Sequence, residues 1–289
     1  MTIRRPAEAS APAAETAAPP REPLVRVERL AKSYVHRRPI SRAVFQVVAL
    51  ADASLTIPHG KTLALIGDSG SGKSTLARCL ALLERPTSGA IWFDGKNVLE
   101  LLPREKFAIH GQVQMIFQDP ASALNPRMTA LEIVTEPLEA QKQGSTAQRR
   151  DLALEWMARV GLPDGSERKR PMEFSGGQRQ RLAIARALVL APKLLILDEA
   201  LSSLDLANQE TISRLLAELQ REHSLTYLHI SHDLRMVADL ADEIAVMHEG
   251  KVVEQRPAAE LLSEPRHPYT RDLLLAMPSL ESIVLERSA

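Results

Sequence analysis

The apolar run Thr62-Leu-Ala-Leu-Ile66 is followed directly by Gly67-Asp-Ser-Gly-Ser-Gly-Lys-Ser74. It fits the pattern G-x-x-x-x-G-K-S, with a helical pattern over residues 74–84 behind it. The glycines let backbone N–H groups surround phosphate oxygens, which the N-terminus of the following helix also attracts. We expect Lys73 to reach the β- and γ-phosphates and Ser74 to ligate Mg²⁺. The alternative, a flexible Gly/Ser loop, does not explain the strand and helix on either side.

The bulk composition is that of an ordinary globular protein. The chain has 289 residues, enough for one large core with a subdomain, and 45% of them are hydrophobic. Lys plus Arg and Asp plus Glu are both 36, so the zero net charge gives no general reason to bind nucleic acid, and we expect none. The single cysteine, Cys79, excludes an internal disulfide and fits a reducing cytoplasm. No apolar run approaches the ~20 residues of a spanning helix, so a membrane role would come through a partner.

Strands alternating with helices predict an α/β fold built on a mainly parallel sheet. Residues 1–22 are rich in Ala and Pro and are expected to form a disordered tail before one domain over residues 23–289. The block of residues 119–190 shows no strand pattern and is read as a helical insertion. The expected strands are 23–30, 45–57, 62–66, 90–93, 113–117, 194–197, 226–230, 243–247 and 251–254, and the expected helices are 74–84, 129–139, 147–160, 177–190 and 208–222.

A second chemical motif is Leu194-Leu-Ile-Leu-Asp198-Glu199, an apolar strand that ends in two acids. Asp198 is suited to hold Mg²⁺, and Glu199 is placed to polarise an attacking water as general base. Taken alone, the acids would be read as a solvated strand end. Their pairing with the phosphate loop favours hydrolysis of a nucleotide.

A third motif, Ser175-Gly-Gly-Gln178, precedes a helix and offers a second set of hydroxyl and N–H donors. One chain needs a single set for one nucleotide. A second set is explained if it covers the nucleotide held by another subunit. The alternative is an ordinary N-cap with a glycine turn, which uses the same serine, so both readings stay open.

The three motifs, in this order and spacing, resemble the ABC ATPase family over nearly the whole chain after the tail. The resemblance implies that Gln118 contacts Mg²⁺ and the attacking water, that His232 contacts the γ-phosphate, and that Tyr34 stacks on adenine. Ser203-Leu-Asp205 resembles the family's D-loop, which crosses a dimer interface. Each residue has a simpler reading: an exposed strand end for Gln118, a helix start bonded to Asp233 for His232, and core packing for Tyr34.

The resemblance also implies a RecA-like core sheet, an antiparallel β subdomain, a helical subdomain at about 119–190 and a C-terminal extension at about 255–289. The implied cofactors are ATP and Mg²⁺. The residues expected to bind ATP are Tyr34, Gly67, Asp68, Ser69, Gly70, Ser71, Gly72, Lys73, Ser74, Thr75, Ser175, Gly176, Gly177 and Gln178. The expected Mg²⁺ ligands are Ser74, Gln118 and Asp198, and the expected catalytic residues are Glu199, His232, Gln118 and Lys73.

Residues 118–129, the pair Glu136-Pro137 and residues 267–278 (His-Pro-Tyr-Thr-Arg-Asp-Leu-Leu-Leu-Ala-Met-Pro) resemble the ATPases of dipeptide and oligopeptide importers, in wording closest to their F-type subunit. Related nickel and glutathione importers share much of this pattern and remain alternatives. Residues 267–278 could also be a turn and a surface helix. Two departures are Ala200, where the family usually has proline, and Ser202-Ser in place of Ser-Ala; the first resembles some nickel-importer ATPases.

The resemblance also implies several partners. They are a second ATPase subunit, either a sibling or a second copy, two transmembrane permease subunits and, indirectly, an extracytoplasmic binding protein. The implied location is the cytoplasmic face of a bacterial inner membrane. A soluble ABC ATPase acting on ribosomes or DNA is the main rival, but those relatives have two cassettes in a chain or long coiled coils between the halves. An inactive, regulatory cassette is a third reading, although no catalytic group is missing. The transported cargo stays open.

Overall fold

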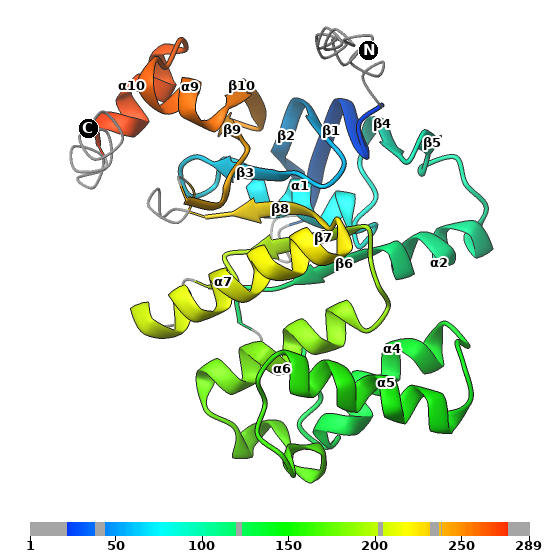
Figure 1. Cartoon of the computed structure of the whole chain (residues 1–289). Coiled ribbons are helices and arrows are strands. Elements are labelled where there is room, and N and C mark those ends of the chain that lie inside the picture. Colours follow the sequence, from blue (N-terminus) through cyan, green and yellow to red (C-terminus); the bar gives the residue numbers. More distant parts are fainter. Residues whose placement is uncertain are drawn as a thin grey trace, which may run out of the picture.

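The computed structural model describes residues 22–37, 44–119, 123–201, 205–231, 237 and 239–276 (Figure 1). The expected disordered tail lies outside these residues apart from Glu22. His232 and residues 202–204, which include the first two residues of the expected D-loop, also lie outside them.

A parallel sheet forms the centre of the molecule. Its strands run in the order β9 (Glu243–His248), β3 (Thr62–Ile66), β8 (Thr226–Ile230), β7 (Leu194–Asp198) and β6 (Val113–Ile116), each parallel to its neighbour. Every residue of β3, β7 and β8 is buried, as expected for strands covered on both faces. The predicted α/β class and parallel core are confirmed.

An antiparallel sheet joins one edge of this core. β1 (Val25–Arg37) pairs with β2 (Val44–Ile57) and with β4 (Ser88–Phe93), and β4 pairs with the short β5 (Lys96–Asn97). β10 (Lys251–Pro257) is antiparallel to β9 and touches β2, so it links the two sheets. The expected antiparallel β subdomain is therefore present.

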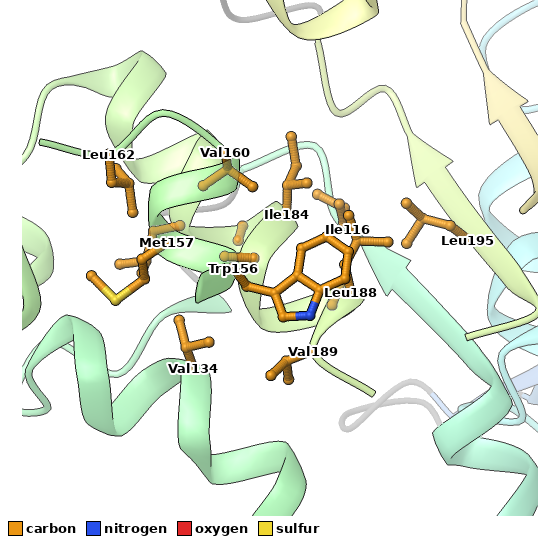
Figure 2. Packing of buried hydrophobic residues seen from close by; sticks show 14 of the residues in the cluster. Ile116, Val134, Trp156, Met157, Val160, Leu162, Ile184, Leu188, Val189 and Leu195 are labelled. Carbon is orange, nitrogen blue, oxygen red and sulfur yellow. The ribbon is translucent and has the colours of Figure 1, made fainter. Parts of the chain in front are cut away.

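A layer of helices covers β6 and β7, made by α4 (Ala130–Ala140), α5 (Thr146–Arg159) and α6 (Gly176–Leu188), with 3-10 turns η1 (Ser166–Arg168) and η2 (Pro171–Glu173) between α5 and α6. Figure 2 shows Trp156 of α5 among the buried side chains of this layer. The same cluster includes Ile116 of β6 and Leu195 of β7. The expected helical block is present, and it shares its core with the sheet; the subdomain limits near 119 and 190 remain a prediction.

Two helices near the nucleotide motif differ from the prediction. α1 (Lys73–Leu80) ends four residues before Glu84, because Leu82 takes a left-handed φ of 57° and the N–H groups of Leu83 and Glu84 turn back to the carbonyl of Arg78. α2 (Pro103–Gln112) was not expected. Only two residues of α2, Ile109 and Gly111, are buried. Its sequence therefore carries little of the apolar periodicity from which a helix is predicted.

The C-terminal segment packs against the opposite end of the sheet from α4 and α5 (Figure 1). In the chain, α7 (Leu206–His223) precedes β8. The last two helices described, α9 (Ala258–Ser263) and α10 (Pro268–Leu275), form a buried cluster with β3 and β9. Thus α10 is not merely a surface helix, since Leu273 and Leu274 are both only 6% exposed. Among the described helices, none combines the length and apolar character needed to cross a membrane.

Candidate nucleotide-binding and hydrolysis site

Polar residues from four of the predicted segments lie at one edge of the parallel sheet. Strands β3, β6, β7 and β8 all run in the same direction, so their carboxyl ends meet at that edge. The residues at or just after these ends are Gly67, Gln118, Asp198 with Glu199, and Ser231. This edge is where open α/β sheets place their ligands. The fold therefore gathers motifs from four distant parts of the sequence.

Lys73 is the buried cation of the site, with 7% of its surface exposed. Its Nζ donates to the carbonyl oxygens of Gly67 and Asp68, both at 2.8 Å. Burial is the main cause that lowers the pKa of Lys73, opposed by the nearby charges of Glu199, Asp68 and Asp198. A buried ammonium group makes stronger hydrogen bonds to an anion than to the neutral carbonyls that hold it here. This arrangement therefore fits a phosphate-binding site.

The shape of the phosphate loop depends on two of its glycines. At Gly67, with φ of 146°, an added Cβ would lie 2.1 Å from the carbonyl oxygen of Met247. At Gly72, with φ of 106°, it would lie 2.4 Å from the carbonyl oxygen of Ala49. The loop therefore lies directly against the backbones of β9 and β2, which only glycine allows.

Ser74 and Asp198 form the oxygen pair expected for a metal ion. The Ser74 hydroxyl donates to Oδ1 of Asp198 at 3.0 Å, across a separation of 124 residues. Burial, the largest influence, raises the pKa of Asp198, while the Ser74 hydrogen bond and Arg78 act in the other direction. A nearby cation would favour the ionised carboxylate. A hydroxyl beside a buried carboxylate is a donor set that fits Mg²⁺, which binds oxygen ligands and often one or two carboxylates.

Glu199 lies beside this pair and is fixed by two hydrogen bonds. Its N–H donates to the carbonyl oxygen of Ile230 at 3.0 Å, and its Oε2 accepts from Nε2 of Gln118 at 2.9 Å. Its φ of 50° is in the left-handed region, an uncommon conformation for glutamate that clusters at functional sites. The next residue, Ala200, is fully buried in the core of the helical layer. The structure thus joins Gln118 to the predicted base.

The Ser175 motif lies elsewhere in the chain. Ser175 caps α6: its hydroxyl accepts from the N–H of Gln178 at 3.3 Å, and Oε1 of Gln178 accepts from the N–H of Ser175 at 3.1 Å. An added Cβ on Gly176 would meet nothing within 4 Å, whereas on Gly177 it would meet Asn208 of α7 at 3.0 Å. In Figure 1, α6 lies in the helical layer, separated in the view from β3 and α1 by β7 and α7. Within one chain, this motif is not brought to the phosphate loop.

Tyr34 is partly buried at the end of the antiparallel sheet. Its hydroxyl donates to Glu84, just after α1, and Thr75 of α1 also bonds to it. Nζ of Lys32 lies 5.0 Å from the centre of its ring. Burial is the main cause that raises the pKa of Tyr34. The ring is therefore fastened to the helix that carries the phosphate loop, while its role with adenine remains a prediction.

One residue of the site was missed by the sequence prediction. The hydroxyl of Tyr269 donates to Oδ2 of Asp68 at 2.8 Å and accepts from the N–H of Asp68 at 3.1 Å. Tyr269 belongs to the motif at residues 267–278, which indicated a branch of the family but carried no sign of contact with a loop 201 residues away.

Comparisons with known proteins identify the relatives of this chain. A family model described as ABC transporter matches residues 50–202. The chain is 45% identical over 260 residues to a probable peptide ABC transporter ATP-binding protein of Sinorhizobium fredii, covering 88% of this chain and 72% of the relative. It is 41% identical over 263 residues to the dipeptide transport ATP-binding protein DppF of Escherichia coli, covering 90% and 78%.

The fold agrees with a solved structure of the same kind. A dimeric ATP-binding cassette in a post-hydrolysis state, bound to ADP and Pi, superposes with a TM-score of 0.72 at 30% identity, covering 81% of this chain and 98% of that one. With the phosphate loop, Asp198, Glu199 and Gln118 gathered at one sheet edge, the chain belongs to the ABC transporter family, as one of its ATP-hydrolysing subunits.

Proposed function

We propose that this chain hydrolyses ATP with Glu199 as general base and thereby powers an importer of dipeptides or oligopeptides. The observation that carries the proposal is the placement of Lys73, the Ser74–Asp198 pair and the Gln118–Glu199 pair at one edge of the sheet. A cation for phosphate, oxygen ligands for a metal and a held carboxylate are the parts that phosphoryl transfer to water needs.

In this proposal, Lys73 exchanges its bonds to the loop carbonyls for bonds to the phosphates of ATP. Glu199 accepts a proton from water as the water oxygen bonds to the γ-phosphorus and the bond to the bridging oxygen of ADP breaks. Gln118 keeps the carboxylate of Glu199 oriented toward that water. When bound by Ser74, Asp198 and Gln118, Mg²⁺ would neutralise charge on the phosphate oxygens. His232, outside the described residues, is proposed to contact the γ-phosphate.

The nucleotide site is proposed to be completed by a second ATPase subunit. Ser175 and its two glycines begin a helix in a different layer from the phosphate loop, with Gly176 open on its Cβ side. We propose that they cover a nucleotide held by another chain; in support, a structural relative is a dimer bound to ADP and Pi. The partner is either a sibling subunit or a second copy.

The peptide cargo and the membrane partners are inferred from the relatives, whose names specify peptide and dipeptide transport. We propose that two permease subunits anchor the chain at the cytoplasmic face of the inner membrane and that an extracytoplasmic protein delivers the peptide. The segment of residues 118–129, which starts at Gln118 beside Glu199, is proposed to carry movement to the permease. Nickel or glutathione is the alternative cargo.

The test is peptide uptake in cells that lack this chain and carry either the wild-type chain or Glu199→Gln. The wild-type chain should restore uptake of a labelled dipeptide, whereas Glu199→Gln should bind ATP normally and lower hydrolysis by about 10²–10⁴-fold, the usual worth of a general base. Glu155→Gln, at an exposed carboxylate of α5, serves as the matched control and should behave as wild type.

Two results would decide against parts of the proposal. Hydrolysis by the assembled complex that survives Glu199→Gln would remove Glu199 from the role of base. If the wild-type chain restored uptake of nickel or glutathione but not of the dipeptide, the proposed peptide cargo would be wrong and the ATPase assignment would remain.

A further inference from the structure

The C-terminal segment reaches the nucleotide site through the hydroxyl group of Tyr269. Tyr269, on the first turn of α10, makes two hydrogen bonds to Asp68, the second residue of the phosphate loop, one to its carboxylate and one to its backbone N–H. The carbonyl oxygen of the same residue accepts from Nζ of Lys73 at 2.8 Å. Asp68 is therefore held on one side by the cation of the site and on the other by the C-terminal segment.

Tyr269 is itself held firmly. Its ring stacks on His248 of β9, with ring centres 3.8 Å apart and planes 29° from parallel. The start of α10 is fixed by Glu254 of β10, whose carboxylate accepts from the N–H groups of Arg266 and His267, both at 2.9 Å. Leu273 and Leu274 of the same helix pack into the core with β3 and β9. The hydroxyl thus occupies a place set by the sheet, independent of any nucleotide.

The bonds of Lys73 to the loop carbonyls and its bonds to phosphate compete with each other. Its Nζ has three hydrogens and donates within the loop to two carbonyl oxygens, with the Ser71 hydroxyl a further 3.4 Å partner. When Lys73 turns to the phosphates, Asp68 loses the bond at its carbonyl. The bonds from Tyr269 do not involve Lys73 and remain, and they keep the Asp68 carboxylate directed toward α10.

Deepening the proposed ATPase function, on which it rests, we propose that Tyr269 is a positioning residue of the phosphate loop that holds Asp68 in place for ATP binding. A loop kept in its binding shape loses less conformational freedom when the phosphates arrive. Because the hydrogen bonds from Tyr269 are the same in the ATP-bound state and in the transition state of hydrolysis, they strengthen ATP binding without changing the rate of the chemical step. The C-terminal segment is in this way part of the nucleotide site.

The test compares Tyr269→Phe with the wild-type chain in the assembled complex. The phenylalanine ring keeps the stacking on His248 and removes only the hydroxyl. The KM for ATP should rise about three- to ten-fold, the worth of one or two hydrogen bonds, with kcat changed by less than about two-fold. Tyr227→Phe is the matched control, because its buried hydroxyl donates to the carbonyl of Leu216 at 2.9 Å, away from the loop. This control should lower thermal stability and leave the KM unchanged.

A double-mutant cycle with Asp68→Ala connects the effect to the contact. Substituting Asp68 should change the KM by a smaller factor in the Tyr269→Phe background than in the wild type. An unchanged KM in Tyr269→Phe, or equal factors in the two backgrounds, would overturn the proposal. If the wild-type complex hydrolysed no ATP, the proposed function itself would fail. If the wild type and Tyr269→Phe both hydrolysed ATP normally, only the role of Tyr269 would fail.

Discussion

Gly72 determines at the residue scale how closely the phosphate loop approaches the rest of the protein. It precedes α1 with a φ of 106°, and the place of its missing Cβ lies 2.4 Å from a carbonyl oxygen of β2. Two penalties therefore apply to any side chain here, the left-handed backbone and the clash. Gly165 has a φ of 80° but open space around its Cβ position. A side chain at Gly165 therefore meets the backbone penalty without the clash.

We predict that Gly72→Ala abolishes ATP binding, whereas Gly165→Ala leaves it unchanged. The left-handed backbone costs alanine about 1–2 kcal/mol at either position, but only at Gly72 must the loop also move away from β2. Nucleotide titration together with thermal unfolding measures both quantities. Normal ATP affinity in a folded Gly72→Ala protein would show that the loop shape seen here is not the binding shape.

At the element scale, Ser175 at the start of α6 caps the helix and is also proposed to contact a nucleotide. Ser175 and Gln178 form a capping box, and Ser145 and Gln148 form the same box at the start of α5, with the same distance of 3.3 Å from the serine hydroxyl to the N–H of the glutamine. Both serines stabilise a helix to a similar degree. Any difference between them in activity therefore reports a second role.

We predict that Ser175→Ala and Ser145→Ala lower the free energy of unfolding by a similar amount, about 1 kcal/mol, because each removes one N-cap. Only Ser175→Ala should also lower ATP hydrolysis, since its hydroxyl is proposed to reach a nucleotide on the partner chain. Urea unfolding and steady-state hydrolysis make the comparison. Equal activity in the two variants would leave Ser175 as a helix cap alone.

For the whole molecule, the single cysteine reports on opening of the core behind the phosphate loop. Cys79 is fully buried on α1, in the cluster shared by β1, β2, β3 and α1. Burial raises the pKa of its thiol from 9.0 to about 11. A raised pKa means that the folded state favours the neutral thiol, so this contribution to stability is complete below pH 9.0 and is lost as the pH rises toward 11.

We predict that a thiol reagent labels Cys79 at pH 8 at least about a hundred-fold more slowly in the native protein than in urea, since two pKa units separate the thiolate populations. Saturating ATP should slow labelling further, because bound ligand stabilises the closed protein. The Cys79→Ala protein provides the unlabelled control. Labelling as fast in the native state as in urea would mean that the thiol is accessible and α1 loosely packed.

The amino-acid sequence was enough to predict the phosphate loop, Asp198 and Glu199 at the end of β7, and most of the elements. These features are local: left-handed glycines, a lysine at a helix start and apolar runs of strand length are constrained by the backbone of the same segment. Gln118 was assigned through family resemblance, since its own surroundings in the sequence indicated only a strand end. The early end of α1 and the presence of α2 escaped prediction, because a weak apolar pattern does not specify which residues will be covered.

Tertiary structure alone decided which segments meet. Gln118 reaches Glu199 over 81 residues, Ser74 reaches Asp198 over 124, and Tyr269 reaches Asp68 over 201. These contacts depend on the strand order β9-β3-β8-β7-β6, which does not follow the order of the chain. A periodic pattern states that a face is buried but not what buries it. Long-range hydrogen bonds form only after packing of the sheet has fixed both partners, and for that reason the link from the C-terminal segment to the phosphate loop could be found only in the folded molecule.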